Sequence, residues 1–335
     1  MTPAIFGLSG PAITPDERAF FTEADPAGYI LFGRNVSDRD QMRALTDDLR
    51  SLHGRDDLPI LIDQEGGRVA RMKAPVWPEF PPGPRFDALY EISPMAAIEA
   101  ARTNARAIAH ILAEVGVTVD CLPLLDVATP STHAIIGDRA LGREPMRVAA
   151  MGRAILDGLR RGGVVGVVKH MPGHGRALVD SHMEMPHVDA SAEELESDLA
   201  PFVALNRAPM GMTAHLLYRA WDADNPGTLS PAVVQDIIRG RIGFDGLLMT
   251  DDIDMKALSG SAGEKAVRAL AAGVDVVLDC WGRMDEMQDI VRRCPPMTGR
   301  ARERLDRAMA TIADGREEAD FAELVARRDA LLAAA

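Results

Sequence analysis

Cysteine and aromatic residues are scarce in this chain of 335 residues. Its three cysteines, Cys121, Cys280 and Cys294, lie far apart, and only 4% of the residues are Phe, Trp or Tyr. An odd number of widely spaced cysteines does not fit the disulfide framework of a small secreted domain. We therefore expect free thiols and a reducing compartment, the cytoplasm.

Long apolar runs and clusters of positive charge are also missing. The longest aliphatic run, "VVGVV" at 164–168, is much shorter than the roughly 20 residues that cross a bilayer. The first residues lack the basic start and the apolar stretch of a secretory signal. A formal net charge of -13 repels nucleic acids and anionic membranes. We expect neither of these partners, and a monomer rather than an oligomer.

Several catalytic signatures are absent as well. The chain has no G-x-S-x-G elbow, no P-loop and no G-x-G-x-x-G turn, the usual marks of serine hydrolases and nucleotide-binding enzymes. Four of its eight histidines lie in residues 169–187, spaced H-x3-H-x7-H-x4-H. This spacing differs from the H-E-x-x-H of zinc proteases, and no cysteine is near. We expect no metal and no other cofactor.

Eight short apolar runs alternate with longer amphipathic segments along the chain. Most of the runs are almost continuously hydrophobic, as is typical of parallel strands that are buried on both faces. The alternation favours an α/β fold. We expect a single (β/α)8 TIM-type barrel with its active site at the carboxyl ends of the strands, although a doubly wound sheet has the same pattern. The predicted strands are 4–8, 28–33, 59–63, 119–127, 164–170, 210–216, 246–251 and 274–280.

The segments between these runs carry helix signals. Residues 38–53 and 94–116 have the 3.6-residue hydrophobic period of amphipathic helices. Residues 191–194 have the sequence of a capping box. The charged segment from about 298 to 335 predicts a helical extension packed outside the barrel. Because no low-complexity linker divides the chain, we expect one catalytic domain over residues 1–335.

Titratable side chains end five of the predicted strands. A single Asp after a strand is more often a turn or a helix cap than a catalyst. Five strands that end in this way indicate a site, because the carboxyl ends of barrel strands meet at one face. The side chains are Asp63, Asp126, Lys169 with His170, His215, and Asp251 with Asp252.

Lysine is rare here, since only four of the 37 basic residues are lysines. Lys169 stands at a strand end beside His170, where a compact ammonium can act in a way that a planar guanidinium cannot. The alternative is chance placement of a scarce residue. We expect Lys169 to face a water-filled pocket outside the core, and Lys265 to lie on the surface.

The segment 169–187 reads "KHMPGHGRALVDSHMEMPH" and leaves regular structure after its strand. Pro172 and two glycines predict a loop, and the length of 171–182 suits a flap. If the loop is extended, Asp180 and His182 project to the same side, and the Asp can orient the imidazole for proton transfer. The alternative is a turn in which the histidine is solvated and has no catalytic role.

Five motifs together resemble glycoside hydrolase family 3, specifically its single-domain bacterial β-N-acetylhexosaminidases. They occur in the family's order across residues 61–257, and the K-H-x-P-G-H-G…D-S-H motif is highly specific. The matching stretches are "LIDQEGGRVARM" (61–72), "IGDRALGREP" (136–145), "KHMPGHGRALVDSH" (169–182), "MTAHLLY" (212–218) and "GFDGLLMTDDIDMKA" (243–257). Met171 and Leu141 stand where the family pattern has Phe.

The resemblance implies roles for individual residues. Asp251 matches the catalytic nucleophile, His182 the general acid/base and Asp180 its partner. Glu65 is a possible second acid, but its place in a Gly turn indicates structural hydrogen bonds instead. The residues that match sugar-holding positions are Asp63, Arg71, Arg139, Lys169 and His170.

The resemblance also implies a function. A retaining enzyme of this kind removes terminal N-acetylglucosamine from cell-wall fragments such as GlcNAc-anhydroMurNAc-peptides, in peptidoglycan recycling. Other functions stay open. They are a family-related β-glycosidase or glycoside phosphorylase with a different sugar specificity, cleavage assisted by the substrate's acetamido group with the Asp251–Asp252 pair, and a sugar-binding protein without activity.

Overall fold

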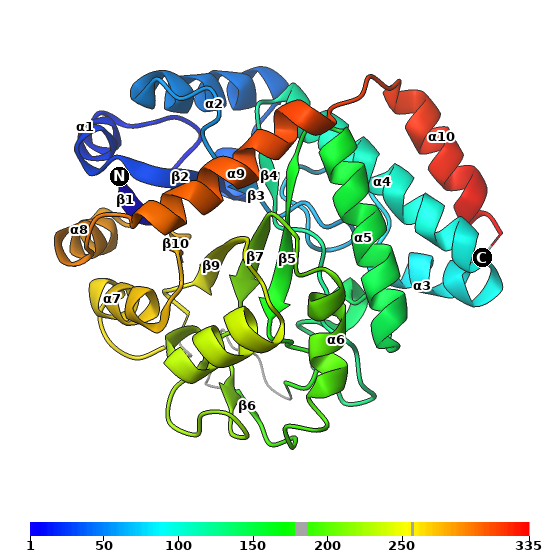
Figure 1. The fold of residues 1–335 in the computed structure, drawn as a ribbon. Helices are drawn as coiled ribbons and strands as arrows, with labels where there is room; N and C mark the ends of the chain where they lie inside the picture. Colours follow the sequence, from blue (N-terminus) through cyan, green and yellow to red (C-terminus); the bar gives the residue numbers. More distant parts are fainter. Residues whose placement is uncertain (178–185, 256–257, 335) are drawn as a thin grey trace.

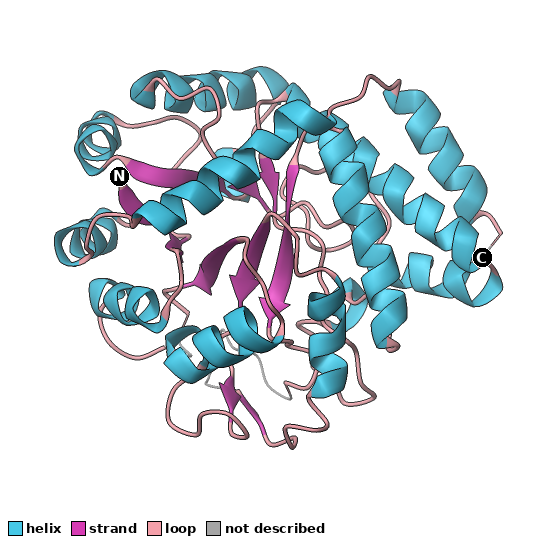
Figure 2. Ribbon diagram, in the orientation of Figure 1, coloured by secondary structure: helices cyan, strands magenta, loops and turns pink. Residues whose placement is uncertain are grey.

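A closed barrel of eight parallel strands forms the centre of the computed structural model, which describes residues 1–177, 186–255 and 258–334. Around the barrel the strands follow the order β1-β10-β9-β7-β5-β4-β3-β2. Helices surround the strands on the outside (Figures 1 and 2). The predicted barrel is confirmed, and its closure excludes the doubly wound sheet.

All eight predicted strands are present in the barrel. Two further short strands, β6 and β8, form a separate parallel pair at the carboxyl side. The barrel strands are β1 Thr2–Gly7, β2 Pro26–Leu31, β3 Ile60–Ile62, β4 Val119–Asp120, β5 Val165–Met171, β7 Met210–Thr213, β9 Leu247–Asp252 and β10 Val276–Asp279, and the pair is β6 His187–Val188 with β8 Leu217–Tyr218.

The helices start at residues that suit helix caps. The Asp38 side chain accepts from the Gln41 amide at the start of α2, and the Ser93 side chain accepts from the Ala96 amide at the start of α4. The α-helices are α1 Pro15–Ala24, α2 Arg39–His53, α3 Gly83–Ile92, α4 Pro94–Glu114, α5 Pro145–Arg161, α6 Glu196–Ala204, α7 Ala262–Ala272, α8 Met284–Arg293, α9 Gly299–Gly315 and α10 Phe321–Leu332. Short 3-10 helices η1 Gly33–Asn35, η2 Gly137–Arg139 and η3 Gly227–Leu229 and the π-helix η4 Ala232–Arg241 complete the set.

Two predicted elements differ from the structure. The strand expected over 119–127 is regular only at Val119–Asp120, because the Leu122 amide donates back to the Asp120 carbonyl and Pro123 has no amide hydrogen to donate. The chain stays close to β5, where Leu124 bridges Lys169. The capping-box bonds of 191–194 form, but α6 begins at Glu196, after a turn.

The barrel interior is filled by side chains from alternate positions of the strands. Ile5, Leu61, Val167 and Met249 belong to this inner cluster. Helix α9 lies across the amino ends of the strands (Figure 1) and adds Leu305, Ala308 and Met309 to the same cluster. The C-terminal extension therefore closes the bottom of the barrel, while α10 packs against α4.

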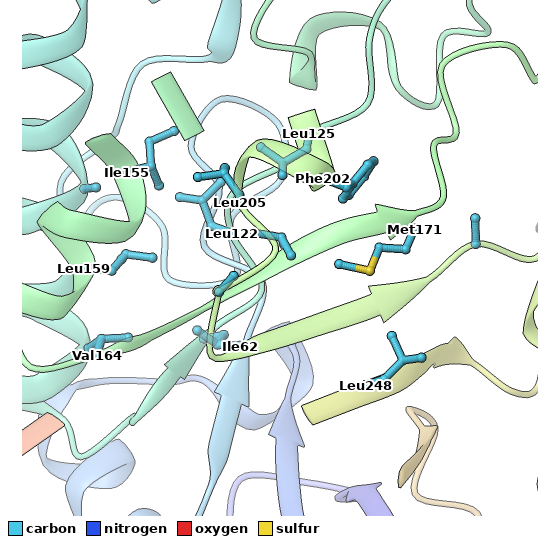
Figure 3. Packing of buried hydrophobic residues seen from close by; sticks show 14 of the residues in the cluster. Ile62, Leu122, Leu125, Ile155, Leu159, Val164, Met171, Phe202, Leu205 and Leu248 are labelled. Atoms are coloured by element: carbon cyan, nitrogen blue, oxygen red, sulfur yellow. The ribbon is translucent and has the colours of Figure 1, made fainter. Parts of the chain in front are cut away.

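A larger apolar cluster lies between the strands and the outer helices. Figure 3 shows part of it, with Ile155 and Leu159 of α5 beside Leu122 and Leu205. Lys265 of α7 is only 6% exposed, so the expectation that it lies on the surface is wrong. In the described part of the chain no helix is long and apolar enough to cross a membrane.

Candidate active site

Charged side chains from several strands meet at the carboxyl end of the barrel. Lys169 near the end of β5 reaches two carboxylates of the loop after β3. Its Nζ lies 3.2 Å from Oδ1 of Asp63 and 2.6 Å from Oε1 of Glu65. The Lys169 side chain is only 2% exposed. The expectation that it faces a water-filled pocket is therefore wrong, because two carboxylates replace its water shell.

Two arginines complete this cluster. Nη2 of Arg71 donates to Oδ2 of Asp63 over 2.8 Å. Arg139 of η2 forms a two-pronged ion pair with Glu65, over 2.7 and 2.8 Å, and donates to the Ile135 carbonyl. Glu65 is thus held in structural bonds, as its place in a Gly turn indicates. These bonds use one of the five N–H donors of Arg71 and three of those of Arg139.

A glycine turn makes this geometry possible. Gly66 and Gly67 have φ of +95° and +56°, a region that other residues rarely adopt. The turn is closed by hydrogen bonds from the amides of Glu65 and Gly66 to the Val69 carbonyl. It therefore brings Glu65 and Arg71, which flank it in the sequence, to the same end of the barrel.

The cations keep the carboxylates of this cluster ionised. Burial alone would raise the pKa of Asp63, but Lys169 and Arg71 outweigh it and lower that pKa well below its usual range. The same balance, with Lys169 and Arg139 as cations, lowers the pKa of Glu65 to about 2. Although burial opposes it, the carboxylates raise the pKa of Lys169. The cluster offers fixed charges that can bind the hydroxyl groups of a neutral ligand.

His170 is oriented by a buried carboxylate, Asp126, which stands among the strand-end residues but received no role from the family resemblance. Oδ2 of Asp126 lies 2.8 Å from Nδ1 of His170, and Oδ1 accepts from the amides of His170 and His174 over 3.2 and 2.7 Å. Burial opposes ionisation, but His170 lowers the pKa of Asp126 to about 2. The ionised carboxylate accepts from Nδ1, which leaves Nε2 as the ring nitrogen that can meet a ligand.

Asp251 lies in β9, next to the last residue of that strand, and accepts the Asp252 amide on Oδ1 over 2.8 Å. Nε2 of His215 lies 2.9 Å from the Asp252 carbonyl and therefore donates to it, while Nδ1 lies 2.7 Å from the Thr228 hydroxyl. Burial would raise the pKa of Asp251, but His170 and His215 outweigh it and lower that pKa. Asp251 is therefore ionised at neutral pH.

Asp252 has a different environment from its neighbour. Its Oδ1 accepts from the amides of Cys280 and Asp254 over 3.2 and 3.3 Å. Burial and the charge of Asp251 raise the pKa of Asp252 to about 6. The two adjacent carboxyl groups are thus not equivalent, since Asp252 ties the loop to β10 and Asp251 lies among histidines.

The other predictions concern the acid/base pair, the two departures from the family pattern and metal binding. Asp180 and His182 lie outside the described residues. Met171 and Leu141 are both buried. Among the residues that the structure describes, no group of three or more His, Cys, Asp or Glu side chains could hold a metal ion.

Asp126 and His215 are positioning residues whose roles the sequence analysis did not assign, although it places both at strand ends. Their signal was present, since both stand near strand ends with the other polar groups. The sequence could not show that Asp126 bonds to His170, because their pairing spans 44 residues and depends on the adjacency of the chain after β4 to β5.

Known proteins resemble this chain over most of its length. A β-hexosaminidase from Methylococcus capsulatus is 41% identical over 281 residues, which cover 82% of each chain. A second β-hexosaminidase, from Chromobacterium violaceum, is 36% identical over 332 residues, or 98% of this chain and 91% of the other.

Solved structures give the same result for the fold. Native NagZ from Neisseria gonorrhoeae matches with a TM-score of 0.87 and 30% identity, over 99% of this chain and 98% of the other. NagZ from the same species in complex with N-trifluoroacetyl-D-glucosamine matches with a TM-score of 0.87, 29% identity, and 99% and 97% coverage. The sequence profile described as "Glycosyl hydrolase family 3 N terminal domain" matches residues 8–313. The chain therefore belongs to glycosyl hydrolase family 3.

Proposed function

We propose that this protein is a retaining exo-β-N-acetylglucosaminidase, a β-N-acetylhexosaminidase that removes terminal N-acetylglucosamine from peptidoglycan fragments such as GlcNAc-anhydroMurNAc-peptides. The observation that carries the proposal is the placement of an ionised Asp251 at the carboxyl end of the barrel, beside the Asp63–Arg71–Lys169 network. The names of the β-hexosaminidase relatives support the activity.

The network is proposed to hold the terminal sugar. Lys169, Arg71 and Arg139 offer N–H donors, and Asp63 offers carboxylate oxygens, to hydroxyl and acetamido groups. His170 adds its Nε2, with the ring held by Asp126. Because the partners are fixed before substrate arrives, little reorganisation is needed to place the anomeric carbon against Asp251.

Asp251 is the proposed nucleophile. Its carboxylate attacks the anomeric carbon, and the bond from that carbon to the glycosidic oxygen breaks as the oxygen takes a proton. His182, with Asp180 as its partner, is the proposed donor of that proton. Water then attacks the glycosyl ester, gives its proton to His182 and releases the sugar with its original anomeric configuration.

A histidine can replace the usual acid carboxyl for a physical reason. Its pKa of about 6.5 lies close to neutrality, so it can donate a proton in the first step and accept one in the second. A carboxyl needs burial to raise its pKa that far. Both Asp180 and His182 lie outside the described residues, so their role is derived from the sequence motif.

Several further features belong to the proposal. The chain acts as a single catalytic domain, residues 1–335, with the extension from about 298 onward closing the barrel base. It works as a monomer in the cytoplasm, in peptidoglycan recycling. It binds a small carbohydrate and needs no metal or other cofactor, and it has no nucleic acid or membrane partner.

Trapping of the covalent intermediate tests the proposal. A slow 5-fluoro derivative of N-acetylglucosaminyl fluoride keeps the acetamido group and destabilises the positive charge of both transition states. Mass spectrometry should then find the adduct on the peptide "LLMTDDIDMK" at Asp251. An oxazoline product without an adduct would instead indicate attack by the acetamido group, and an adduct elsewhere would reject Asp251.

The product in phosphate buffer tests the second step. Water as acceptor yields free N-acetylglucosamine, whereas phosphate as acceptor yields the sugar 1-phosphate. We expect the free sugar at all phosphate concentrations. A sugar phosphate would assign the protein to the glycoside phosphorylases, and no turnover of any hexosaminide would assign it to sugar-binding proteins.

A further inference from the structure

Trp281 is an exposed tryptophan in a chain that has only three. It is 54% exposed, whereas Trp77 is 3% exposed and Trp221 is partly buried. A large aromatic ring in water loses the favourable burial that its size would provide. Such a side chain is therefore a candidate for contact with a ligand or partner.

The residue lies at the same end of the barrel as the proposed site. β10 ends at Asp279, and Trp281 follows two residues later. The neighbouring Cys280 amide donates to Oδ1 of Asp252, next to Asp251. Gly282, with φ of +66°, turns the chain so closely that a Cβ there would lie 2.7 Å from the Leu8 carbonyl carbon. The turn fixes Trp281 on the rim beside the loop after β9.

One side of the Trp281 ring already has a partner. The guanidinium carbon of Arg283 lies 5.8 Å from the ring centroid, in cation–π range. Arg283 is itself held by ion pairs to Asp254 and Glu286. The cation therefore steadies the ring from one side, and more than half of the residue's surface stays open to a ligand.

A continuous line of contacts joins Trp281 to the proposed sugar-binding residues. Arg34 donates to the carbonyl of Cys280, the residue before Trp281. The guanidinium carbons of Arg34 and Arg71 both lie near the Phe32 ring, 5.0 and 5.1 Å from its centroid. Arg71 in turn pairs with Asp63. These contacts connect the loops that follow β3, β2 and β10 along one rim of the barrel. The proposed sugar-binding residues lie at the β3 end of this rim, and Trp281 lies at the β10 end.

We infer that Trp281 is a specificity-determining residue, which stacks on the sugar ring of the leaving group next to the scissile bond. The inference rests on the proposed function. The faces of pyranose rings carry C–H groups that pack on indole, while their hydroxyls stay in water. The ring and the site share one rim, so the inference predicts that a substrate of two linked sugars contacts both. A substrate without a second sugar ring cannot stack on Trp281 and therefore gains no binding energy from it.

Two substrates separate this role from a general effect on the site. N,N′-diacetylchitobiose has a second pyranose, and N-acetyl-β-glucosaminyl fluoride has only a fluoride leaving group. Trp281→Ala should lower kcat/KM for the disaccharide about 10-fold, mainly through KM, because stacking binds ground state and transition state alike. The fluoride should keep its rate. Trp281→Phe should retain most of the activity on the disaccharide.

A matched control is Met95→Ala, which truncates another apolar side chain, 84% exposed at the start of α4. It should change neither rate. Equal losses of Trp281→Ala on both substrates, or an unchanged rate on the disaccharide, would overturn the inference while leaving the proposed function intact. A wild-type protein that cleaves neither substrate would overturn the proposed function, and the inference with it.

Fluorescence provides a measurement that needs no turnover. A thio-linked, uncleavable form of the disaccharide should shift the tryptophan emission of the wild type, because indole emission responds to loss of water contact. The larger part of that shift should vanish in Trp281→Phe. N-acetylglucosamine alone should give a much smaller shift than the disaccharide in the wild type. An equal shift in wild type and variant would place the leaving-group ring away from Trp281.

Discussion

The two ends of the barrel each hold a cluster of carboxylates and cations, but the clusters are built differently. At the carboxyl end, Lys169 is enclosed between Asp63 and Glu65. At the amino end, Arg304 of α9 bridges two carboxylates that precede strands, Asp245 and Asp275. The amino-end cluster is otherwise made of Arg239, Arg300 and Arg307.

The amino-end cluster joins secondary-structure elements. Asp275 accepts from Arg304, from Arg239 of η4 and from the amide of Leu248 in β9. Its polar atoms are thus used within the protein, and the cluster holds α9 against the barrel. The carboxyl-end cluster lies beside Asp251, and its proposed role is to hold the terminal sugar. The comparison agrees with the usual division in barrels, in which one face supports stability and the other supports chemistry.

The largest expected effect concerns the carboxyl end. His182→Ala should slow hydrolysis of a natural sugar linkage roughly 10²–10⁴-fold. An activated aryl glycoside needs less protonation of its leaving group, so its rate should fall far less. Steady-state kinetics on both substrates checks this, with the thermal midpoint as a control for folding. Equal losses on both substrates would remove His182 from the acid role.

Lys169→Arg probes whether the carboxyl-end cluster needs a compact cation. The planar guanidinium adds bulk where Asp63 and Glu65 already fill the space, and misplacement of the sugar should cost on the order of 100-fold in kcat/KM. Because Lys169 is buried, the thermal midpoint should fall as well. Lys73→Arg is the matched control, since Lys73 is exposed. Full activity of Lys169→Arg would show that charge alone suffices.

Asp126→Asn tests the orientation of His170. The amide keeps one oxygen acceptor but can place an N–H group against Nδ1–H of His170, so the ring must change tautomer or turn. We expect a loss of about 10- to 100-fold in kcat/KM, by analogy with other carboxylates that orient a functional histidine. The inhibition constant of N-acetylglucosamine should rise too. Unchanged kinetics with a lower thermal midpoint would assign Asp126 a purely structural role.

Arg304→Lys is the reciprocal exchange at the amino end. One ammonium cannot reproduce the bonds of a guanidinium to both Asp245 and Asp275, and Asp275 is buried. The thermal midpoint should fall by several degrees, because a buried polar group that loses its hydrogen-bond partner lowers the free energy of unfolding by roughly 1–3 kcal/mol. The kcat/KM at 25 °C should stay at the wild-type value. A loss of activity without a loss of stability would contradict the division between the two ends.

The smallest expected effect concerns Asp279, the last residue of β10. Its side chain has no ion pair within the described residues. Burial, together with Asp252 and Glu286, raises the pKa of Asp279 from 3.8 to about 7. Between these values the folded chain holds more protons than the unfolded chain, so the free energy of unfolding falls as pH rises. Asp279→Asn removes this dependence.

Thermal midpoints of Asp279→Asn and wild type at pH 4, 6 and 8 check this effect. The difference, variant minus wild type, should increase by a few degrees from pH 4 to pH 8. Asp285→Asn serves as the control, because Asp285 lies nearby at the start of α8 and is not buried. A difference that does not change with pH would show that Asp279 titrates normally.

Much of the barrel and part of its site follow from local sequence. Continuous apolar runs such as 164–168 predict buried parallel strands, because only a strand covered on both faces tolerates such composition. Polar residues directly after the runs predict the carboxyl face, since parallel strands end together. The strand over 119–127 is too long as predicted, because apolar character alone does not show that the Leu122 amide turns back to the Asp120 carbonyl.

The sequence by itself determined the alternation of strands and helices, the polar residues at the strand ends and the family motifs, because these depend on periodicity and order along the chain, whereas closure of the sheet into a barrel was decided by the tertiary structure. Only the tertiary structure decided that Lys169 is enclosed by carboxylates, that Lys265 is buried and that Asp126 holds His170. Burial and ion pairing depend on which distant segments become neighbours. That arrangement is a property of the closed barrel as a whole.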